Sequence, residues 1–227
     1  MSKNKQNENQ LVVTPDMLWN KSGLIQQLIV FIFLLIIYTT VIIILHRSPK
    51  PHLALNEWFT SLKGLFISSK WYWDIILGVI VGTILSHILM TFDIFVAWIL
   101  KKDIPKWIHR ADHLFPRTKT QKKHALIISL IGSTQEEVLF RAYILLAILP
   151  LWSHWIWSAL ILSTIFALFH AGLQGFWATL WIFITSIILC ASIALGKSIY
   201  FVSAIHIMIN INNLILIPLI YYKKKLE

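Results

Sequence analysis

The sequence predicts an all-α fold, a multi-pass transmembrane helical bundle of about six spans with both termini in the cytoplasm. Hydrophobic residues make up 57% of the 227 residues, charged residues make up 13%, and the mean hydropathy is +0.72. This composition is too apolar for an ordinary soluble domain. Several apolar runs also reach roughly 20 residues, the length of helix that crosses a bilayer core about 30 Å thick.

The expected elements follow one another along the whole chain. Residues 1–23 are polar and form a cytoplasmic tail, and the first apolar run is too long for the core of a signal peptide, so it is interpreted as a retained span. Spans are expected at about 24–45, 75–99, 124–149, 154–171, 176–195 and 199–221. Residues 24–123 therefore contain two N-terminal spans, residues 124–221 form the membrane core with the chemistry, and residues 222–227 are a basic cytoplasmic tail.

Two connecting segments carry amphipathic patterns of their own. Apolar residues recur at helical spacing between Leu55 and Phe66, and again between Ile104 and Phe115, with charged residues between them. This pattern is typical of helices that lie in the membrane interface. Both segments are therefore expected to be interfacial helices, the second on the cytoplasmic side.

The distribution of Lys and Arg sets the expected orientation. Three lie in the N-terminal tail, eight in the loop 100–123 and three at the C-terminus, against five on the opposite side. The side with the excess of positive charge faces the cytoplasm. The formal net charge of +10 does not indicate nucleic-acid binding, because these cations lie between apolar runs and at the chain ends.

The third predicted span contains three ionisable residues, Glu136, Glu137 and Arg141. Each costs at least ~2.5–3.5 kcal/mol inside a membrane and needs an explanation. Glu137 and Arg141 are four residues apart in the order that favours an ion pair on one helix face. Glu136 points about 100° away around the helix, so Arg141 is poorly placed for it. A carboxylate without a cation of its own in a low dielectric suits a general base.

Two later spans carry polar residues at helical spacing, as Phe166-x-x-x-His170 and His206-x-x-x-Asn210. Residues four apart share a helix face. Either histidine taken alone is most simply a hydrogen-bonded bundle residue. Counted from the span ends, however, Glu136, His206 and Asn210 fall near mid-membrane, and His170 falls deeper towards the cytoplasm. These groups are therefore expected to meet in one polar pocket.

Taken in order, Glu136-Glu137-x-x-x-Arg141, Phe166-x-x-x-His170 and His206-x-x-x-Asn210 resemble the three motifs of the CPBP family. That family groups type II CAAX prenyl endopeptidases with bacteriocin-processing and bacteriocin-immunity (Abi) proteins. The resemblance covers about 124–212. The two N-terminal spans of the chain, which precede this region, match no known motif. It implies an intramembrane glutamic endopeptidase that cuts a CAAX-like substrate, a bacteriocin or a leader peptide.

The resemblance also implies roles for the individual residues. Glu136 with His170 would activate a water molecule, and His206 with Asn210 would donate hydrogen bonds to the developing oxyanion, a role that suits an imidazole N–H and an amide. Phe166 becomes a candidate for the substrate pocket. No cofactor and no metal are implied, and the expected partners are the lipid bilayer and a peptide or membrane-tethered protein substrate.

Other functions remain open at this point. Histidines and carboxylates can ligate zinc, although H-E-x-x-H is absent and no histidine lies three or four residues from Glu136 or Glu137. A non-enzymatic bacteriocin immunity protein is the alternative from another class, while a transporter is disfavoured because no repeat is visible. The usage of Ile, Lys and Asn favours a bacterial cell membrane over the endoplasmic reticulum. His87 and Asp93 are most simply structural polar contacts, and Cys190 is a small apolar filler. Asn212 and Asn213 could equally support the site residues or form helix–helix hydrogen bonds.

Overall fold

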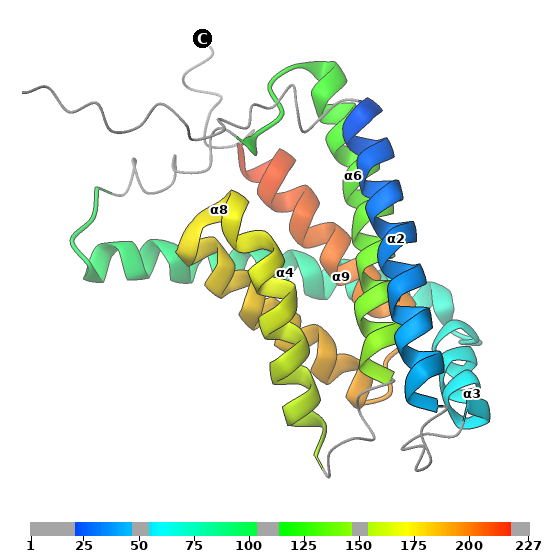
Figure 1. Ribbon diagram of the computed structural model, residues 1–227. Coiled ribbons are helices and arrows are strands. Elements are labelled where there is room, and N and C mark those ends of the chain that lie inside the picture. The colour runs from blue at the N-terminus through cyan, green and yellow to red at the C-terminus, as the bar shows by residue number, and fades with distance from the viewer. Residues whose placement is uncertain (1–20, 47–54, 104–113, 147–153, 219–227) are drawn as a thin grey trace, which may run out of the picture.

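The computed structural model describes residues 21–46, 55–103, 114–146 and 154–218, and every regular element in these ranges is a helix (Figure 1). The all-α fold class is therefore confirmed. Three helices are long and apolar enough to cross a membrane, Trp71–Ile99, Phe176–Ala194 and Ile199–Leu216, and two shorter apolar helices cover Leu28–Ile37 and Trp155–Ala171. The expected number of spans and the cytoplasmic termini stay predictions.

The N-terminal helix α2 (Lys21–His46) runs beside α6 (Figure 1). A hydrogen bond of 3.0 Å between Thr39 Oγ1 and Tyr143 OH links it to the helix that follows α6. Helix α3 (Leu55–Phe66) forms where the first amphipathic pattern predicted a helix, and Tyr200 OH donates to the Phe66 carbonyl. The second amphipathic segment, 104–115, lies mostly outside the described residues.

Helix α4 (Trp71–Ile99) packs closely against α9 (Ile199–Ile211) through two glycines. A Cβ atom added to Gly78 would lie 2.6 Å from the Phe201 carbonyl oxygen, and one added to Gly82 would lie 2.6 Å from the Ile205 carbonyl oxygen. The spacing Gly78-x-x-x-Gly82 puts both on one face, and small residues at this spacing let membrane helices approach backbone to backbone. This contact holds α9 in place.

Helix α6 (Lys119–Glu137) begins at a capping box and ends in a wider turn. At its start Thr118 Oγ1 accepts from the Gln121 backbone N–H, while the Gln121 side chain accepts from the Thr118 backbone N–H. The chain then continues without a break as the π-helix η2 (Val138–Leu145), and α9 continues in the same way as the π-helix η4 (Asn212–Leu216). Short π-helical segments occur frequently at functional sites.

The long helical element α8 (Trp155–Ala194) reverses direction near its middle (Figure 1). Ser163 Oγ lies 3.9 Å from Cys190 Sγ, whereas a straight helix would separate residues 27 apart by about 40 Å. The two antiparallel halves, Trp155–Ala171 and Phe176–Ala194, correspond to the fourth and fifth predicted spans.

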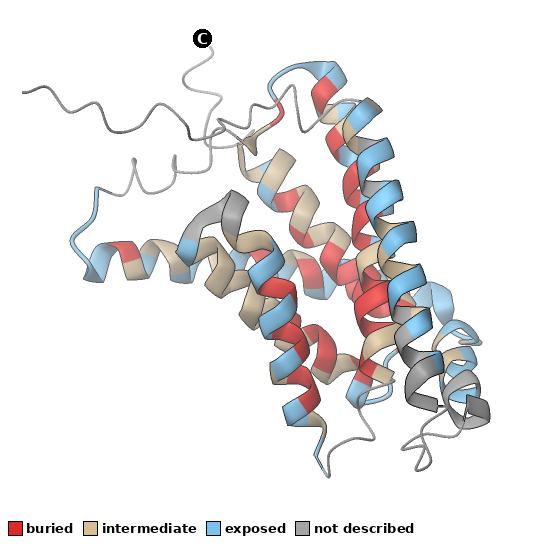
Figure 2. Ribbon diagram, in the orientation of Figure 1, coloured by how far each residue is buried: buried red, intermediate tan, exposed pale blue. Residues whose placement is uncertain are grey.

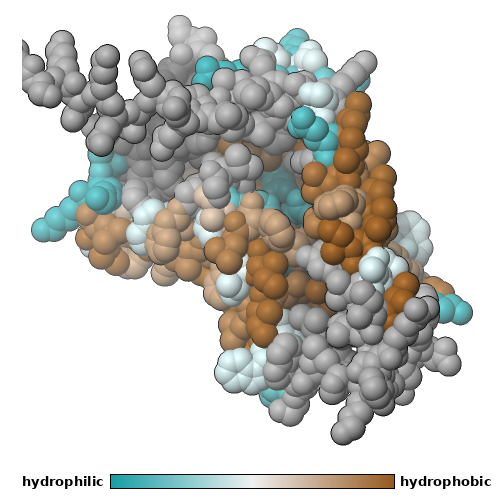
Figure 3. Space-filling model, viewed as in Figure 1, coloured by the Kyte–Doolittle hydropathy of each residue, from teal (hydrophilic) through white to brown (hydrophobic). Residues whose placement is uncertain are grey.

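Most buried apolar residues form one core cluster, and Ala125 and Ile128 of α6 form a smaller one. Buried and exposed positions alternate along the helices (Figure 2), and many of the exposed positions are large apolar residues. Leu139 of η2, Leu162 and Leu189 of the two halves of α8, and Val202 and Ile205 of α9 are each at most 2% exposed. The outward faces of α2, α4 and α8 are apolar and appear brown in Figure 3. Such surfaces suit contact with lipid rather than water.

Candidate active site

The candidate site begins at the junction of α6 and η2, where Glu137 and Arg141 are both fully buried. Arg141 Nη1 donates to Glu137 Oε1 at 3.1 Å, and Arg141 Nη2 donates to Ser186 Oγ on the second half of α8 at 2.7 Å. The guanidinium carbon also lies 4.6 Å from the centre of the Phe166 ring, within the range of a cation–π contact. The expected four-residue ion pair is thus present and is tied to two segments of α8.

His206 of α9 lies between the two glutamates. Its Nδ1 is 2.7 Å from Glu137 Oε1, and its Nε2 is 3.7 Å from Glu136 Oε2. Glu137 therefore accepts from both Arg141 and His206 on one oxygen. The Glu136 side chain is 35% exposed, in contrast to the fully buried Glu137. The sequence placed Glu136 without a same-face cation, and the structure gives it an imidazole from another helix instead.

His170 and His206 both lie near the Phe166 ring. The Phe166 ring centre is 4.8 Å from that of His170 and 6.1 Å from that of His206. His170 Nδ1 is bound to the Phe166 carbonyl oxygen at 2.9 Å on its own helix. The pairing of Glu136 with His170 was expected from the family resemblance, but the described contacts join Glu136 to His206. Phe166 is only 4% exposed, and its place in a substrate pocket stays a prediction.

Asn210 and Asn212 point to different neighbours. Asn210 Nδ2 donates to Ser133 Oγ at 2.9 Å, and Ser133 lies one turn before Glu137 on α6. Asn212 Nδ2 donates to Ser86 Oγ of α4 at 2.8 Å. Asn210 therefore contacts α6 one turn before the glutamates, whereas Asn212 forms part of the contact between α9 and α4, which is the helix–helix alternative of its two interpretations.

A hollow opens on the face of the molecule shown in Figure 3. It lies between the apolar surface of α8 and that of α2 and α6, and hydrophilic surface is visible inside it. Of the two carboxylates, only Glu136 is accessible from outside the protein. Part of the Glu136 side chain is therefore exposed, while the ion pair of Glu137 and Arg141 stays buried.

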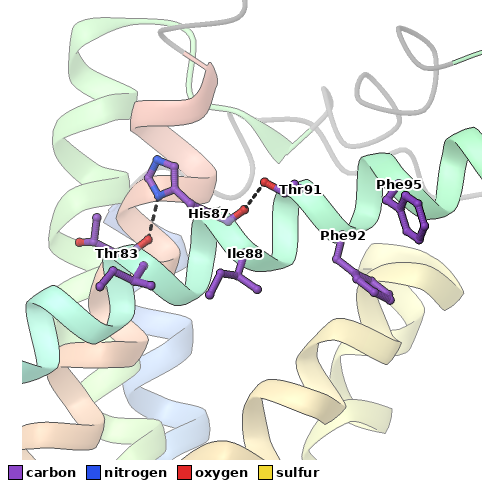
Figure 4. A pocket seen from close by; sticks show the side chains of 7 residues that line it. Thr83, His87, Ile88, Thr91, Phe92 and Phe95 are labelled. Atoms are coloured by element: carbon purple, nitrogen blue, oxygen red, sulfur yellow. Dashed lines mark hydrogen bonds between the residues drawn. The ribbon is translucent and has the colours of Figure 1, made fainter.

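Two further polar residues of the spans, His87 and Asp93, have contacts of their own. The open groove on α4 drawn in Figure 4 has a volume of about 620 Å³, and in it His87 Nδ1 is bound to the Thr83 carbonyl oxygen of the same helix. Asp93 accepts from Trp181 Nε1 at 2.9 Å. Within the described ranges, no group of three or more His, Cys, Asp or Glu residues is arranged to hold a metal ion.

Sequence reasoning did not assign Ser133 or Ser186 to the site, and it did not predict that Glu137 accepts a hydrogen bond from His206. Ser133 stands four residues before Glu137, so helical spacing did place it on the same face, and that signal was available. Ser186 lies 45 residues from Arg141, and no local pattern connects the two. The bond from His206 to Glu137 depends on how α6 and α9 are packed, which spacing along one helix does not define.

The described helices thus bring a carboxylate and a histidine together, Glu136 and His206, and place the amide of Asn210 against the same helix α6. Residues 121–212 match a family model described as Rce1-like, type II CAAX prenyl endopeptidase Rce1-like. This match confirms the recognition of the CPBP and CAAX protease family for residues 121–212. No curated protein and no solved structure matches the chain.

Proposed function

We propose that this protein is a glutamate-dependent intramembrane endopeptidase that hydrolyses a peptide bond in a peptide or a membrane-tethered substrate. The observation that carries the proposal is the accessible Glu136 carboxylate, 3.7 Å from His206 Nε2 and next to the buried pair of Glu137 and Arg141. All of these residues lie inside the region matched to type II CAAX prenyl endopeptidases. The buried pair keeps the cluster in place, and Glu136 is left to act on a water molecule.

The proposed chemistry is addition of water to the scissile carbonyl. Glu136 takes a proton from the water, and the oxygen of the water bonds to the carbonyl carbon, whose oxygen becomes an oxyanion. The protonated Glu136 then delivers that proton to the leaving amine as the C–N bond breaks. The products are a carboxylic acid and an amine, so atoms and charge balance without a further reactant.

His170 supports the base, and its ring orientation suits this role. A carbonyl oxygen only accepts hydrogen bonds, so the contact with Phe166 puts a proton on His170 Nδ1 and leaves Nε2 of the neutral ring as an acceptor. An acceptor nitrogen can help to align or deprotonate a water molecule. This supports the role that the family resemblance implies for His170, with Glu136 as the group that carries the proton onward.

Asn210 is the proposed oxyanion donor. Its side-chain NH₂ has two hydrogens, of which one is engaged by Ser133 Oγ. The second remains for a substrate oxygen, and the bond to Ser133 fixes the plane of the amide before substrate arrives. A donor held in advance is what stabilises charge in a transition state most effectively.

The proposal is tested by cleavage with purified protein. Wild-type protein in detergent or nanodiscs is incubated with CAAX-type peptides, with and without a prenyl group, and with bacteriocin-like leader peptides, and the products are identified by mass spectrometry. A matched control is Asp93→Asn, which removes another intramembrane carboxylate, one bound to Trp181 and separate from the cluster. We expect cleavage by wild type and Asp93→Asn and none by Glu136→Gln. Equal cleavage by all three proteins, or none by wild type, contradicts the proposal.

We further propose that the site acts on the cytoplasmic side of a bacterial cell membrane, as the distribution of Lys and Arg predicts. In a Cys190→Ser background, a membrane-impermeant maleimide should label a cysteine placed at Ser61 in intact cells. It should not label one placed at Thr118, at the start of α6. The reverse pattern of labelling overturns this orientation.

A further inference from the structure

The two ring nitrogens of His206 face two different carboxylates, and this arrangement restricts which nitrogen carries the proton. Nδ1 is bound to Glu137 Oε1 at 2.7 Å inside the protein, and Nε2 faces Glu136 Oε2 at 3.7 Å. Arg141 Nη1 donates to that same Glu137 Oε1 at 3.1 Å, so this oxygen acts as a hydrogen-bond acceptor. The proton of the neutral ring is therefore on Nδ1, and Nε2 is the nitrogen presented to Glu136.

We propose that Glu137, held by Arg141 and Ser186, is a positioning residue that fixes His206 with its proton on Nδ1 and its Nε2 turned to Glu136. The inference rests on the proposed function and gives Glu137 a role beyond that of a structural ion pair. A buried group that orients an imidazole through one nitrogen, so that the other can act, is a recurring element of hydrolytic sites.

The anchoring of Glu137 supports this role. Its carboxylate is fully buried, and Oε1 is held from one side by Arg141, which is itself held by Ser186 across the bundle. A chain of hydrogen bonds thus runs from Ser186 on α8, through Arg141 and Glu137, to His206 on α9. Such a chain leaves the ring of His206 a single orientation, whereas an ion pair needed only to neutralise Arg141 would require no bond to the histidine.

The same geometry defines how His206 takes part in the reaction. Because Nδ1–H is engaged by Glu137, the ring can donate to an oxyanion only from Nε2, and only when Nε2 carries a second proton. With both glutamates counted as carboxylates, Glu136, Glu137 and Arg141 carry two negative formal charges and one positive. One proton shared between Glu136 and His206 Nε2 brings the cluster to zero, which a low-dielectric interior favours. Glu136 and His206 therefore work as one proton-sharing pair, and Glu137 sets its geometry.

The experiment separates positioning from a purely structural role. Glu137→Gln alone leaves Arg141 buried without its anion and is expected to reduce folded protein. The charge-balanced variant Glu137→Leu/Arg141→Met removes both charges and so restores abundance, yet it leaves His206 Nδ1 without an acceptor. Ser163→Ala removes a buried hydroxyl next to Cys190, a neighbour of Arg141, without removing any member of the chain of hydrogen bonds. It is therefore the matched control for disturbance of the core around Arg141.

Two measurements are made on purified proteins, ¹⁵N NMR of the histidine rings and steady-state cleavage. The His206 signals are assigned by their loss in His206→Gln. We expect a hydrogen-bonded Nδ1–H on His206 in wild type and Ser163→Ala, and its loss in the charge-balanced variant. There kcat should fall by about 10²- to 10⁴-fold with little change in KM, the size of loss seen when an orienting carboxylate is removed from a hydrolytic histidine.

A folded charge-balanced variant with wild-type kcat overturns the proposal, because Glu137 would then serve only to neutralise Arg141. A wild-type His206 whose proton is on Nε2 with Nδ1 bare overturns it as well. If wild type cuts no peptide, the proposed function fails, and the NMR signal of His206 by itself decides whether Glu137 fixes the ring.

Discussion

Helix α9 packs against its two principal neighbours in opposite ways. Toward α4 the contact is made by glycines and by backbone, with the hydrogen bond from Asn212 to Ser86 as its polar element. Toward α6 the contact is made by ionisable and polar side chains, His206 with Glu136 and Glu137. Close apolar packing on one face supplies the fixed position that the other face needs for a preorganised polar cluster. The difference shows that one helix can combine close backbone packing on one face with a polar cluster on the other.

The largest expected effect distinguishes the two adjacent glutamates on the α6 side. Glu136→Gln should lower turnover by about 10²- to 10⁴-fold, the usual contribution of a general base, at unchanged abundance, because its side chain is 35% exposed and forms no buried ion pair. Glu137→Gln should instead reduce folded protein, because unpairing the buried Arg141 costs about 3–5 kcal/mol.

Membrane abundance and cleavage are measured together for both variants. The distinction between the two glutamates is lost if Glu136→Gln retains full activity at normal abundance. It is also lost if Glu137→Gln accumulates and cuts like wild type.

The next effect compares the two asparagines of α9. Asn210→Ala should lower kcat by roughly 10²- to 10³-fold with little change in KM, since an oxyanion donor acts mainly on the transition state. Asn212→Ala should leave kcat and KM of the folded protein unchanged and reduce stability by about 1 kcal/mol, the usual contribution of one hydrogen bond. Kinetics and thermal unfolding of the two purified variants test this, and similar kinetics in both would show that the faces of α9 are not functionally distinct.

The smallest expected effect concerns the α4 side. Gly82→Ala would place a Cβ atom 2.6 Å from the Ile205 carbonyl oxygen, and relief of this overlap should cost about 1–3 kcal/mol. Gly64→Ala in α3 is the matched control, because no atom lies within 4 Å of the added Cβ and alanine favours a helix by up to about 1 kcal/mol. Unfolding temperatures measured side by side should fall for the first variant and hold or rise for the second. A stable Gly82→Ala protein would contradict the close packing.

Much of the fold could be predicted because membrane helices leave long apolar runs in the sequence. The runs at 75–99, 154–171 and 176–195 correspond to helices, including both halves of α8. The π-helices η2 and η4 were not predicted, since a widened turn changes no hydropathy pattern. The glycine contact of α4 was visible as Gly78-x-x-x-Gly82 but required knowledge of the partner helix.

The sequence predicted which residues form the candidate site, but it did not predict which of them contact one another. Motif spacing placed Glu136, His206 and Asn210 at a common depth. The structure brings Glu136 and His206 together, and Asn210 of α9 donates to Ser133, one turn before the glutamates on α6. Which histidine faces Glu136 depends on the rotation of α8 and α9 about their axes. Hydropathy and spacing define which residues share a face, but packing between helices decides which faces meet.

The central claim is that the α6 side of α9 forms a peptidase site in which Glu136, and no metal, activates water. The most direct measurement is turnover by purified wild-type and Glu136→Gln protein after treatment with a strong chelator, with bound zinc quantified in the same samples. The account predicts full wild-type turnover without stoichiometric zinc, and no turnover by Glu136→Gln. Loss of wild-type activity in chelator, restored by added zinc, would contradict it and make Glu136 a metal ligand or a metal-assisted base.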